Sequence, residues 1–390
     1  MNADQFTSPY IITAVTALLC FILGFAVSRR GQARGAQPSE RGEQYYIKGL
    51  NYLLSNQTDK AIEEFIRVTH LDPDTIEAYL GLGHLYRTKG DFDRAIRLHR
   101  SILARPDLNN KERQRILLAL GADYKSAGLW ERAVSVFRQV LGINPNKVEV
   151  YQELAAIHEE ERNWQEAFKA QQEFDKRAGS KQKNILAHLQ AEMGKESIAR
   201  GERDKAHKAF KSALSIDPTC LDAALHLGDF YLEEGKTGKA VEIWEGIVSQ
   251  DAPFAYLAYR RLEKAYFEQN RYDDIAKILE GVVTRNTGNV MARVTLGEYY
   301  SKRDMVPEAL RHLREALSIQ PRSLEARRQI SQILVRNHMQ EEMEKEYPEA
   351  VEVLYAPSEP YTCGRCGLKT KDLSWRCPQC RGWDTFTAQD

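Results

Sequence analysis

The stretch LLALGADYKSAGLWERAVSVFRQVLGINP, at Leu117–Pro145, decides the fold of most of this chain. It holds two amphipathic segments whose residue choices suit a pair of packed helices. Gly121 lies where the two helices would cross and allows their backbones to approach closely. Tyr124 would fill the space between neighbouring helices, and Pro145 would end the second helix because it has no amide proton. One such pair cannot bury its own apolar face, so stacked neighbours must supply the core.

The same unit recurs along the chain. A small or apolar residue anchors each second helix, at Ala61, Ala95, Ala133, Ala167, Ala206, Ala240, Ile275 and Ala309, in steps of 34, 38, 34, 39, 34, 35 and 34 residues. A helix-turn-helix period of about 34 residues is typical of tetratricopeptide repeats. We therefore predict an all-α superhelical solenoid of eight repeats over residues 43–322, capping helices over 323–347 and a linker over 348–360. Close helix crossings are expected at Gly83, Gly121, Gly228 and Gly297.

Composition and motifs argue against catalysis. Lys+Arg and Asp+Glu number 55 each, so nothing favours nucleic acid as a ligand. Gly235-Lys236-Thr237 resembles the end of a phosphate-binding loop, but Phe230 stands where that motif needs glycine. The nine histidines form no zinc-protease pattern, and we interpret the run at 159–161 (EEE) as a solvated helix face. The chain is predicted not to be an enzyme.

The N-terminal segment is predicted to be a membrane anchor. No charged residue lies between Phe6 and Ser28, and 18 residues as a helix extend about 27 Å, close to the thickness of a bilayer core. We predict a tail over 1–9, a transmembrane helix over 10–28 and a linker over 29–42. A cleaved signal peptide is the alternative, but Asp4 and the lack of a basic residue before the apolar run disfavour it. Arginines after the span place the body and the C-terminus on the cytoplasmic side of the inner membrane.

The last thirty residues are predicted to bind one metal ion. Two Cys-x-x-Cys pairs, Cys363/Cys366 and Cys377/Cys380, are separated by ten residues, and four thiolates can close a tetrahedral shell. This segment, residues 361–390, is called the knuckle below. It is too small to fold on its own apolar core, so the metal would supply much of its stability.

Zinc is the expected metal, because a closed shell of four sulfurs is a structural zinc arrangement. Iron is the alternative, since the ligand set resembles that of rubredoxin, and a pair of disulfides would require an oxidising compartment. Trp375, Trp383 and Phe386 are expected to pack around the cysteines or to serve as contact residues.

The order of these segments resembles the lipopolysaccharide assembly protein B family of Gram-negative bacteria. One N-terminal span, about eight tetratricopeptide repeats and a rubredoxin-like knuckle match over the whole length, most sharply at 375–383 (WRCPQCRGW). The residues that carry over are the four metal ligands. The partner-binding residues do not, because the repeats vary too much between members for one sequence to locate them.

The resemblance implies a regulatory adaptor and its partners. These are a membrane-anchored AAA+ metalloprotease of the FtsH type, the lipid A deacetylase that it degrades, and enzymes of lipopolysaccharide synthesis. Three other functions stay open: a scaffold that gathers those enzymes without controlling proteolysis, a redox protein with a four-cysteine iron site, and a periplasmic assembly chaperone. The sequence also leaves open whether two copies form a homodimer.

Overall fold

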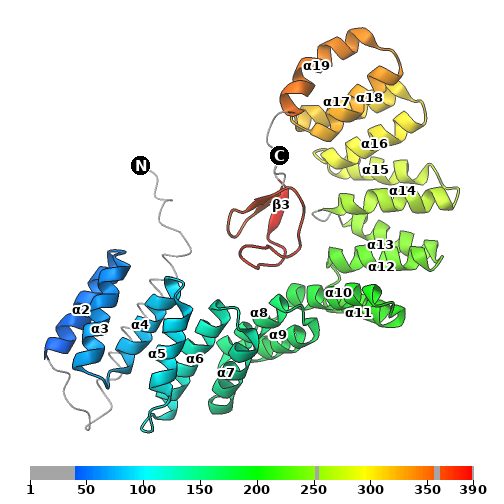
Figure 1. The fold of residues 1–390 in the computed structure, drawn as a ribbon. Helices are drawn as coiled ribbons and strands as arrows, with labels where there is room; N and C mark the ends of the chain where they lie inside the picture. The colour runs from blue at the N-terminus through cyan, green and yellow to red at the C-terminus, as the bar shows by residue number, and fades with distance from the viewer. Residues whose placement is uncertain (1–39, 251–253, 355–360, 389–390) are drawn as a thin grey trace. The chain divides into compact units, whose positions relative to one another are not determined.

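The computed structural model describes residues 40–250, 254–354 and 361–388. They form paired helices followed by the knuckle (Figure 1), which confirms the predicted all-α repeat array and its C-terminal four-cysteine segment. The chain divides into two compact units, Met1–Pro145 and Asn146–Asp390. The first unit holds three helix pairs: α2 (Glu40–Leu54) with α3 (Thr58–Leu71), α4 (Ile76–Thr88) with α5 (Phe92–Leu103), and α6 (Asn110–Ser126) with α7 (Trp130–Ile143).

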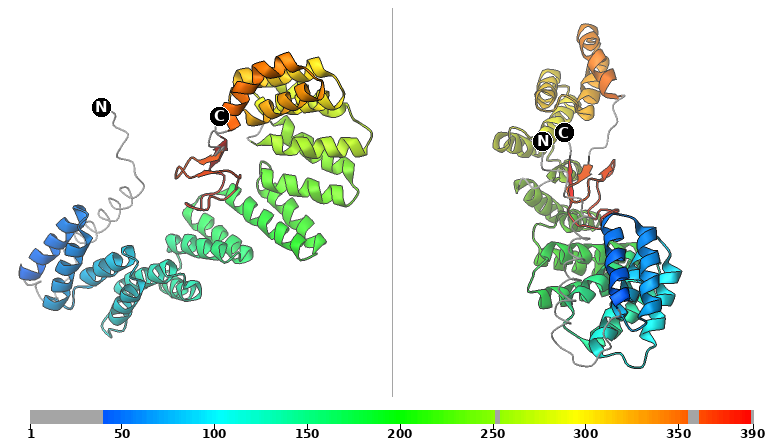
Figure 2. Two further views of the ribbon diagram at one scale, coloured as in Figure 1. Left: turned by 45° about the horizontal axis from the view of Figure 1, so that its top comes forward. Right: turned by 90° about the vertical axis from the view of Figure 1, so that its left-hand side faces the viewer.

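The second unit continues the repeats and ends in the knuckle. Its pairs are α8 (Val148–Glu160) with α9 (Trp164–Ala178), α10 (Lys183–Ala199) with α11 (Arg203–Ile216), α12 (Leu221–Glu233) with α13 (Thr237–Ser249), α14 (Tyr259–Glu268) with α15 (Asp274–Arg285), and α16 (Val290–Lys302) with α17 (Val306–Ile319). A short 3₁₀ helix, η2 (Ala255–Ala258), precedes α14, and α18 (Leu324–Arg336) with α19 (Gln340–Leu354) closes the array. The helices α8 to α19 follow an arc, and the knuckle lies on its inner side (Figures 1 and 2).

The turn inside every repeat is built the same way. One residue with a positive φ stands five positions before each predicted anchor; these residues are Asn56, Gly90, Gly128, Arg162, Gly201, Gly235, Asn270 and Asp304. Glycine adopts this left-handed conformation without steric cost, and Asn and Asp tolerate it better than most residues. Gly235 is therefore a turn residue and not part of a phosphate-binding loop. His338 has the same conformation between α18 and α19, so the capping pair repeats the turn.

Glycines allow the paired helices to touch at the predicted crossings. A Cβ atom on Gly228 would lie 2.1 Å from Trp244 Nε1, and one on Gly121 would lie 2.6 Å from a Phe137 ring carbon. Gly83 and Gly297 are equally close to side chains of their partner helices. All eight anchor residues are buried, so the predicted repeat face forms the core.

The knuckle carries a small antiparallel sheet in the order β2-β1-β3. Its strands are β1 (Tyr361–Cys363), β2 (Lys369–Thr370) and β3 (Phe386–Ala388). Tyr361 pairs with Thr370 on one side and with Ala388 on the other. The sheet thus pairs β1, at the start of the knuckle, with β3, its last described strand.

Some predicted boundaries differ from the observed ones. Helix α2 begins at Glu40, inside the predicted linker, and α19 continues through Pro348 to Leu354 instead of ending at Tyr347. A proline removes one helical hydrogen bond, and the ladder can resume beyond it with a local bend. The predicted transmembrane helix over 10–28 lies outside the described residues. Among the helices that are described, none is long and apolar enough to cross a membrane.

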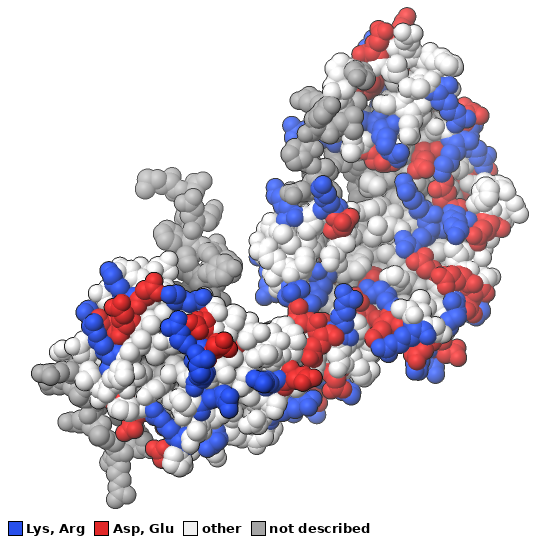
Figure 3. Space-filling model, in the orientation of Figure 1, with Lys and Arg blue, Asp and Glu red and all other residues white. Residues whose placement is uncertain are grey.

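The surface carries both signs of charge. Figure 3 shows Lys and Arg side chains interspersed with Asp and Glu side chains over the described part of the visible face. This matches the balanced composition of 55 basic and 55 acidic residues.

Candidate metal centre

The four cysteines of the knuckle converge on one point. Their sulfur atoms all lie within 4.8 Å of one another, although the two pairs come from separate turns. Cys363 Sγ is 3.6 Å from Cys380 Sγ, and Cys366 Sγ is 3.7 Å from Cys377 Sγ. Four sulfurs bound to zinc at about 2.3 Å would be spaced by about 3.8 Å at the corners of a tetrahedron. The donor set therefore fits one zinc-sized ion.

The two Cys-x-x-Cys turns share one backbone geometry. The Cys363 amide donates to Leu368 O at 2.8 Å, and the Cys377 amide donates to Gly382 O at 2.8 Å, five residues onward in each case. The fourth residue after each first cysteine is left-handed: Gly367 has φ of 74° and Arg381 has φ of 60°. This repeated turn directs both sulfurs of a pair toward the same side, which a shared ion requires.

The four thiols differ in how readily they ionise. Burial opposes ionisation of Cys363, but the Thr385 hydroxyl, 3.2 Å from the sulfur, and nearby backbone amides bring its pKa down to about 6. Burial and hydrogen bonds with the other sulfurs raise the pKa of Cys380 to about 12. Four thiolates cannot gather without a compensating charge, and a central metal ion supplies it.

The knuckle is held on the repeats by ion pairs to the end of α8. Arg376 Nε lies 2.8 Å from Glu159 Oε2, and Arg376 Nη2 lies 3.0 Å from Glu160 Oε1. Arg381 Nη2 is 3.0 Å from the other oxygen of Glu160. The interpretation of 159–161 as a solvated face is therefore wrong for Glu159, which is buried, and for Glu160, which pairs with the knuckle. Glu161 instead pairs with His158 at 3.1 Å.

An aromatic contact and a histidine form the second part of the interface. Trp383 is buried with Ala167 and Leu189 of the repeats. Its ring stacks on the His188 imidazole of α10, with centroids 4.9 Å apart. His188 Nε2 lies 2.6 Å from Asp384 Oδ1. Trp383 is thus buried against the repeats, whereas Phe386 is buried with Cys363 and Cys377.

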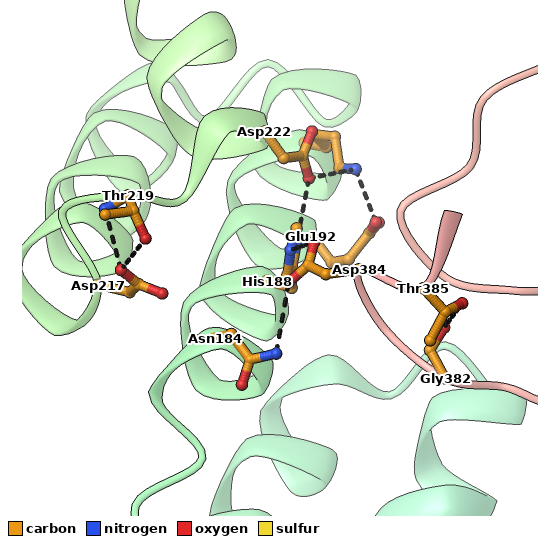
Figure 4. Close-up of polar contacts among 10 residues, drawn as sticks. Asn184, His188, Glu192, Asp217, Thr219, Asp222, Gly382, Asp384 and Thr385 are labelled. Carbon is orange, nitrogen blue, oxygen red and sulfur yellow. Dashed lines mark hydrogen bonds and ion pairs between the residues drawn. The ribbon is translucent and has the colours of Figure 1, made fainter. Parts of the chain in front are cut away.

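His188 belongs to a buried polar cluster that continues behind the interface (Figure 4). Its Nδ1 is 3.7 Å from Asp222 Oδ2, and Lys195 Nζ is 3.1 Å from the same carboxylate oxygen. Lys195 also lies 2.6 Å from Glu192. Burial alone would lower the pKa of His188, but hydrogen bonds and charge from Asp222 and Asp384 raise it to about 9.

A third contact lies near the start of α14. The Tyr256 and Tyr361 hydroxyls are 2.9 Å apart, which joins η2 to β1. The Phe254 and Trp375 rings meet edge to face at 6.2 Å. The knuckle therefore contacts α8, α10 and η2, so it spans segments that are about a hundred positions apart in the sequence.

Comparisons with known proteins agree with this architecture. A family model described as a rubredoxin metal binding domain matches residues 361–388, and tetratricopeptide-repeat models match 78–112 and 197–263. The chain is 29% identical over 371 residues to lipopolysaccharide assembly protein B of Escherichia coli K12, covering 93% of this chain and 94% of that protein. Its counterpart in Haemophilus influenzae is 25% identical over 365 residues, covering 87% and 88%.

The solved structures include the C-terminal part of a tetratricopeptide-repeat protein from Cytophaga hutchinsonii. It is 14% identical, covers 73% of this chain and 99% of that chain, and has a TM-score of 0.40. The family resemblance inferred from the order of segments is confirmed by the sequence relatives.

The structure brings together the four predicted cysteines and adds residues that sequence reasoning missed. His188, Glu159 and Glu160 lie in ordinary repeat helices, where charged and polar side chains are usual. Arg376 lies inside the strongest local motif, yet its partners are 216 positions away at Glu160. Nothing in the spacing of the sequence marks these residues as partners.

Proposed function

Because the chain resembles lipopolysaccharide assembly protein B over most of its length, we propose that it is a non-enzymatic adaptor that regulates lipopolysaccharide synthesis by holding protein partners. One observation of the structure supports this most: the knuckle is bound to the inner side of the repeat arc through α8, α10 and η2. Repeat arrays bind partners on such concave surfaces. A cross-link between helices far apart in sequence would hold that surface in one shape.

Zinc is the metal we propose, with Cys363, Cys366, Cys377 and Cys380 as its ligands. When bound, zinc supplies a structural cross-link and no redox chemistry. The contacts that hold the knuckle on the repeats come from side chains of the chain itself. Arg376 and Asp384 are carried on the turns that the four cysteines shape, so the geometry of the metal centre sets the positions of the groups that contact Glu159 and His188.

We further propose that the adaptor acts at the inner membrane, anchored by residues 10–28 with its body on the cytoplasmic side. Anchoring confines the repeats to a thin layer beside the bilayer and raises the effective concentration of other membrane-bound proteins. The partners proposed are the lipid A deacetylase and the FtsH-type membrane protease that degrades it. Bringing substrate and protease together requires no catalytic group on the adaptor itself.

The test measures the half-life of the lipid A deacetylase in cells that express this chain only as the double variant Cys363→Ser, Cys377→Ser. We expect a longer half-life and accumulation of lipopolysaccharide, with the helical content of the variant retained. Lys371→Ala, an exposed position in the knuckle, is the matched control and should leave the half-life unchanged.

An unchanged half-life in the double variant would refute metal-dependent adaptor function. If deletion of the whole chain also leaves the half-life unchanged but disperses the enzymes of lipopolysaccharide synthesis, the chain is a scaffold without control over proteolysis. Measuring both properties in the same strains separates these two functions.

A further inference from the structure

A cavity of about 550 Å³ lies between the knuckle and the repeats. Asn184 and His188 of α10, the start of α12 and η2 form one side, and Trp375, Asp384 and β3 form the other. Its volume falls in the range of about 300–1,000 Å³ that ligand sites occupy. The cavity exists only where the knuckle meets the repeats, so neither part forms it alone.

Aromatic rings form much of its wall. Phe254, Tyr256, Trp375 and Phe386 all line the cavity. Phe254 has a φ of 66°, a left-handed conformation that is unusual for a bulky residue. Its ring packs edge to face against both Tyr256 and Trp375, at 6.2 Å in each case. Backbone strain of this kind persists only where the surrounding contacts enforce it, and it is concentrated at ligand sites.

The fixed charge of the cavity is negative. No Lys or Arg is among its lining residues, all of which lie in the described part of the chain. Asp384 is paired with His188. Among the described residues, the hydrogen bonds to the Asp217 side chain come from Thr219: its Oδ1 accepts from the Thr219 amide at 2.9 Å and from the hydroxyl at 2.7 Å. Figure 4 shows Asp217 set apart from the His188 cluster, so no cation of that cluster neutralises it.

The Cys220 thiol also lines the cavity and lies near three carboxylates. Burial, followed by the carboxylates of Asp222, Asp384 and Asp217, raises its pKa to about 12. A second cavity of about 530 Å³, which shares Cys220 and Leu221, is different in charge because Lys211 and Lys239 line it. The two cavities therefore differ in the charged side chains that line them.

We propose that this cavity accepts a lysine or arginine side chain from an extended segment of a partner protein. A cation is attracted to aromatic faces as well as to carboxylates, and both are present here. The cavity lies between the repeats and the knuckle on the inner side of the α8–α19 arc, the side on which arrays of this kind bind extended polypeptides. This inference rests on the proposed function, because it assumes that the chain holds protein partners.

The test uses the full-length, zinc-loaded protein in detergent micelles and four peptides of the form Ac-Ala-Ala-Xaa-Ala-Ala-NH₂. Xaa is lysine, arginine, norleucine or glutamate, and binding is followed by Trp fluorescence and by calorimetry. We expect saturable binding of the lysine and arginine peptides and about tenfold weaker binding of the norleucine peptide. The glutamate peptide should not bind.

Asp217→Asn is the decisive variant. Asparagine keeps the oxygen that caps Thr219, so the fold is retained while the charge is lost. We expect about tenfold weaker binding of the lysine peptide. Glu242→Gln, in the second cavity, is the matched control and should bind as the unmodified protein does.

Three outcomes would overturn the inference: equal binding of lysine and norleucine peptides, no effect of Asp217→Asn, or tighter binding of spermidine than of the lysine peptide. The last would assign the cavity to a free polyamine. Deacetylase half-life is a separate measurement. Peptide binding that depends on Asp217, with a half-life insensitive to the cysteine variants, would refute metal-dependent adaptor function and leave the cavity assignment standing.

Discussion

The His188 imidazole on α10 lies 2.6 Å from the Asp384 carboxylate of the knuckle, although 196 positions separate the two residues. Behind it, Asp222 Oδ2 is 3.7 Å from the other ring nitrogen. A buried imidazole between two carboxylates is stabilised in its protonated form. The contact therefore ties the attachment of the knuckle to the charge of one histidine.

The attachment should weaken with rising pH. The pKa of His188 in the folded chain is about 9, above its ordinary value of 6.5. A raised pKa contributes stability that is fully present below about pH 6.5 and is lost as the pH rises through 9. The shift corresponds to about 3 kcal/mol. The melting temperature of the zinc-loaded chain should therefore fall as the pH is raised from 6.5 to 9.5. His188→Gln should flatten the profile, whereas His70→Gln, at an exposed position, should not. A parallel decline in His188→Gln and the unmodified chain would contradict this.

The two arginines that contact Glu160 should differ in their contribution. Arg376 is mostly buried and also contacts Glu159, whereas Arg381 is about half exposed. Removing a buried charged partner costs about 2 kcal/mol, but an exposed ion pair contributes at most about 1 kcal/mol. Arg376→Met should thus speed hydrogen exchange in residues 375–384 far more than Arg381→Met. Equal exchange in the two variants would show that burial of the pair is unimportant.

Removal of the metal should release the knuckle and leave the helices folded. The described part of the knuckle has three short strands and a small apolar cluster built around Phe386 and the cysteines, so its order depends largely on the four-sulfur centre. After treatment with a chelator, circular dichroism at 222 nm should change little while Trp383 becomes exposed to a fluorescence quencher. Adding zinc back should restore protection. Loss of the helical signal together with the metal would refute this division of stability.

A methyl group added where two helices cross should lower the free energy of unfolding. A methyl group added at a helical glycine with open space around it should not. A Cβ on Gly228 would meet Trp244 Nε1 at 2.1 Å, but a Cβ on Gly246 of α13 would meet nothing within 4 Å. Overpacking a core typically costs about 1–3 kcal/mol, and replacing a helical glycine with alanine stabilises by up to about 1 kcal/mol. Urea unfolding of Gly228→Ala and Gly246→Ala should therefore shift in opposite directions. A shift of both variants in the same direction would contradict the packing argument.

Local patterns account for what could be predicted. The turn residues, such as Gly128 and Gly235, stand five positions before their anchors because a helical hairpin needs one left-handed residue there. Each Cys-x-x-Cys pair similarly indicates a turn that directs two sulfurs toward one metal ion. Each of these features is decided within about 34 residues, so one sequence is enough to recognise it.

Boundaries and surface residues were harder to predict. The run at 159–161 reads as a solvated helix face because charged residues usually cover such faces, yet Arg376 and Arg381 pair with it. Pro348 reads as the end of a helix, but α19 passes through it. In both cases the local preference is real and the surroundings override it.

The sequence by itself determined the repeat array and the clustering of the four cysteines, because both follow from short-range spacing and from backbone geometry. The tertiary structure alone decided that the knuckle packs on α8, α10 and η2, that His188 lies between Asp222 and Asp384, and that aromatic rings and Asp217 enclose a cavity. These contacts join residues far apart in the chain. They depend on the curvature of the stacked helices, which results from many small packing angles. The repeat period of the sequence does not show how these angles add up.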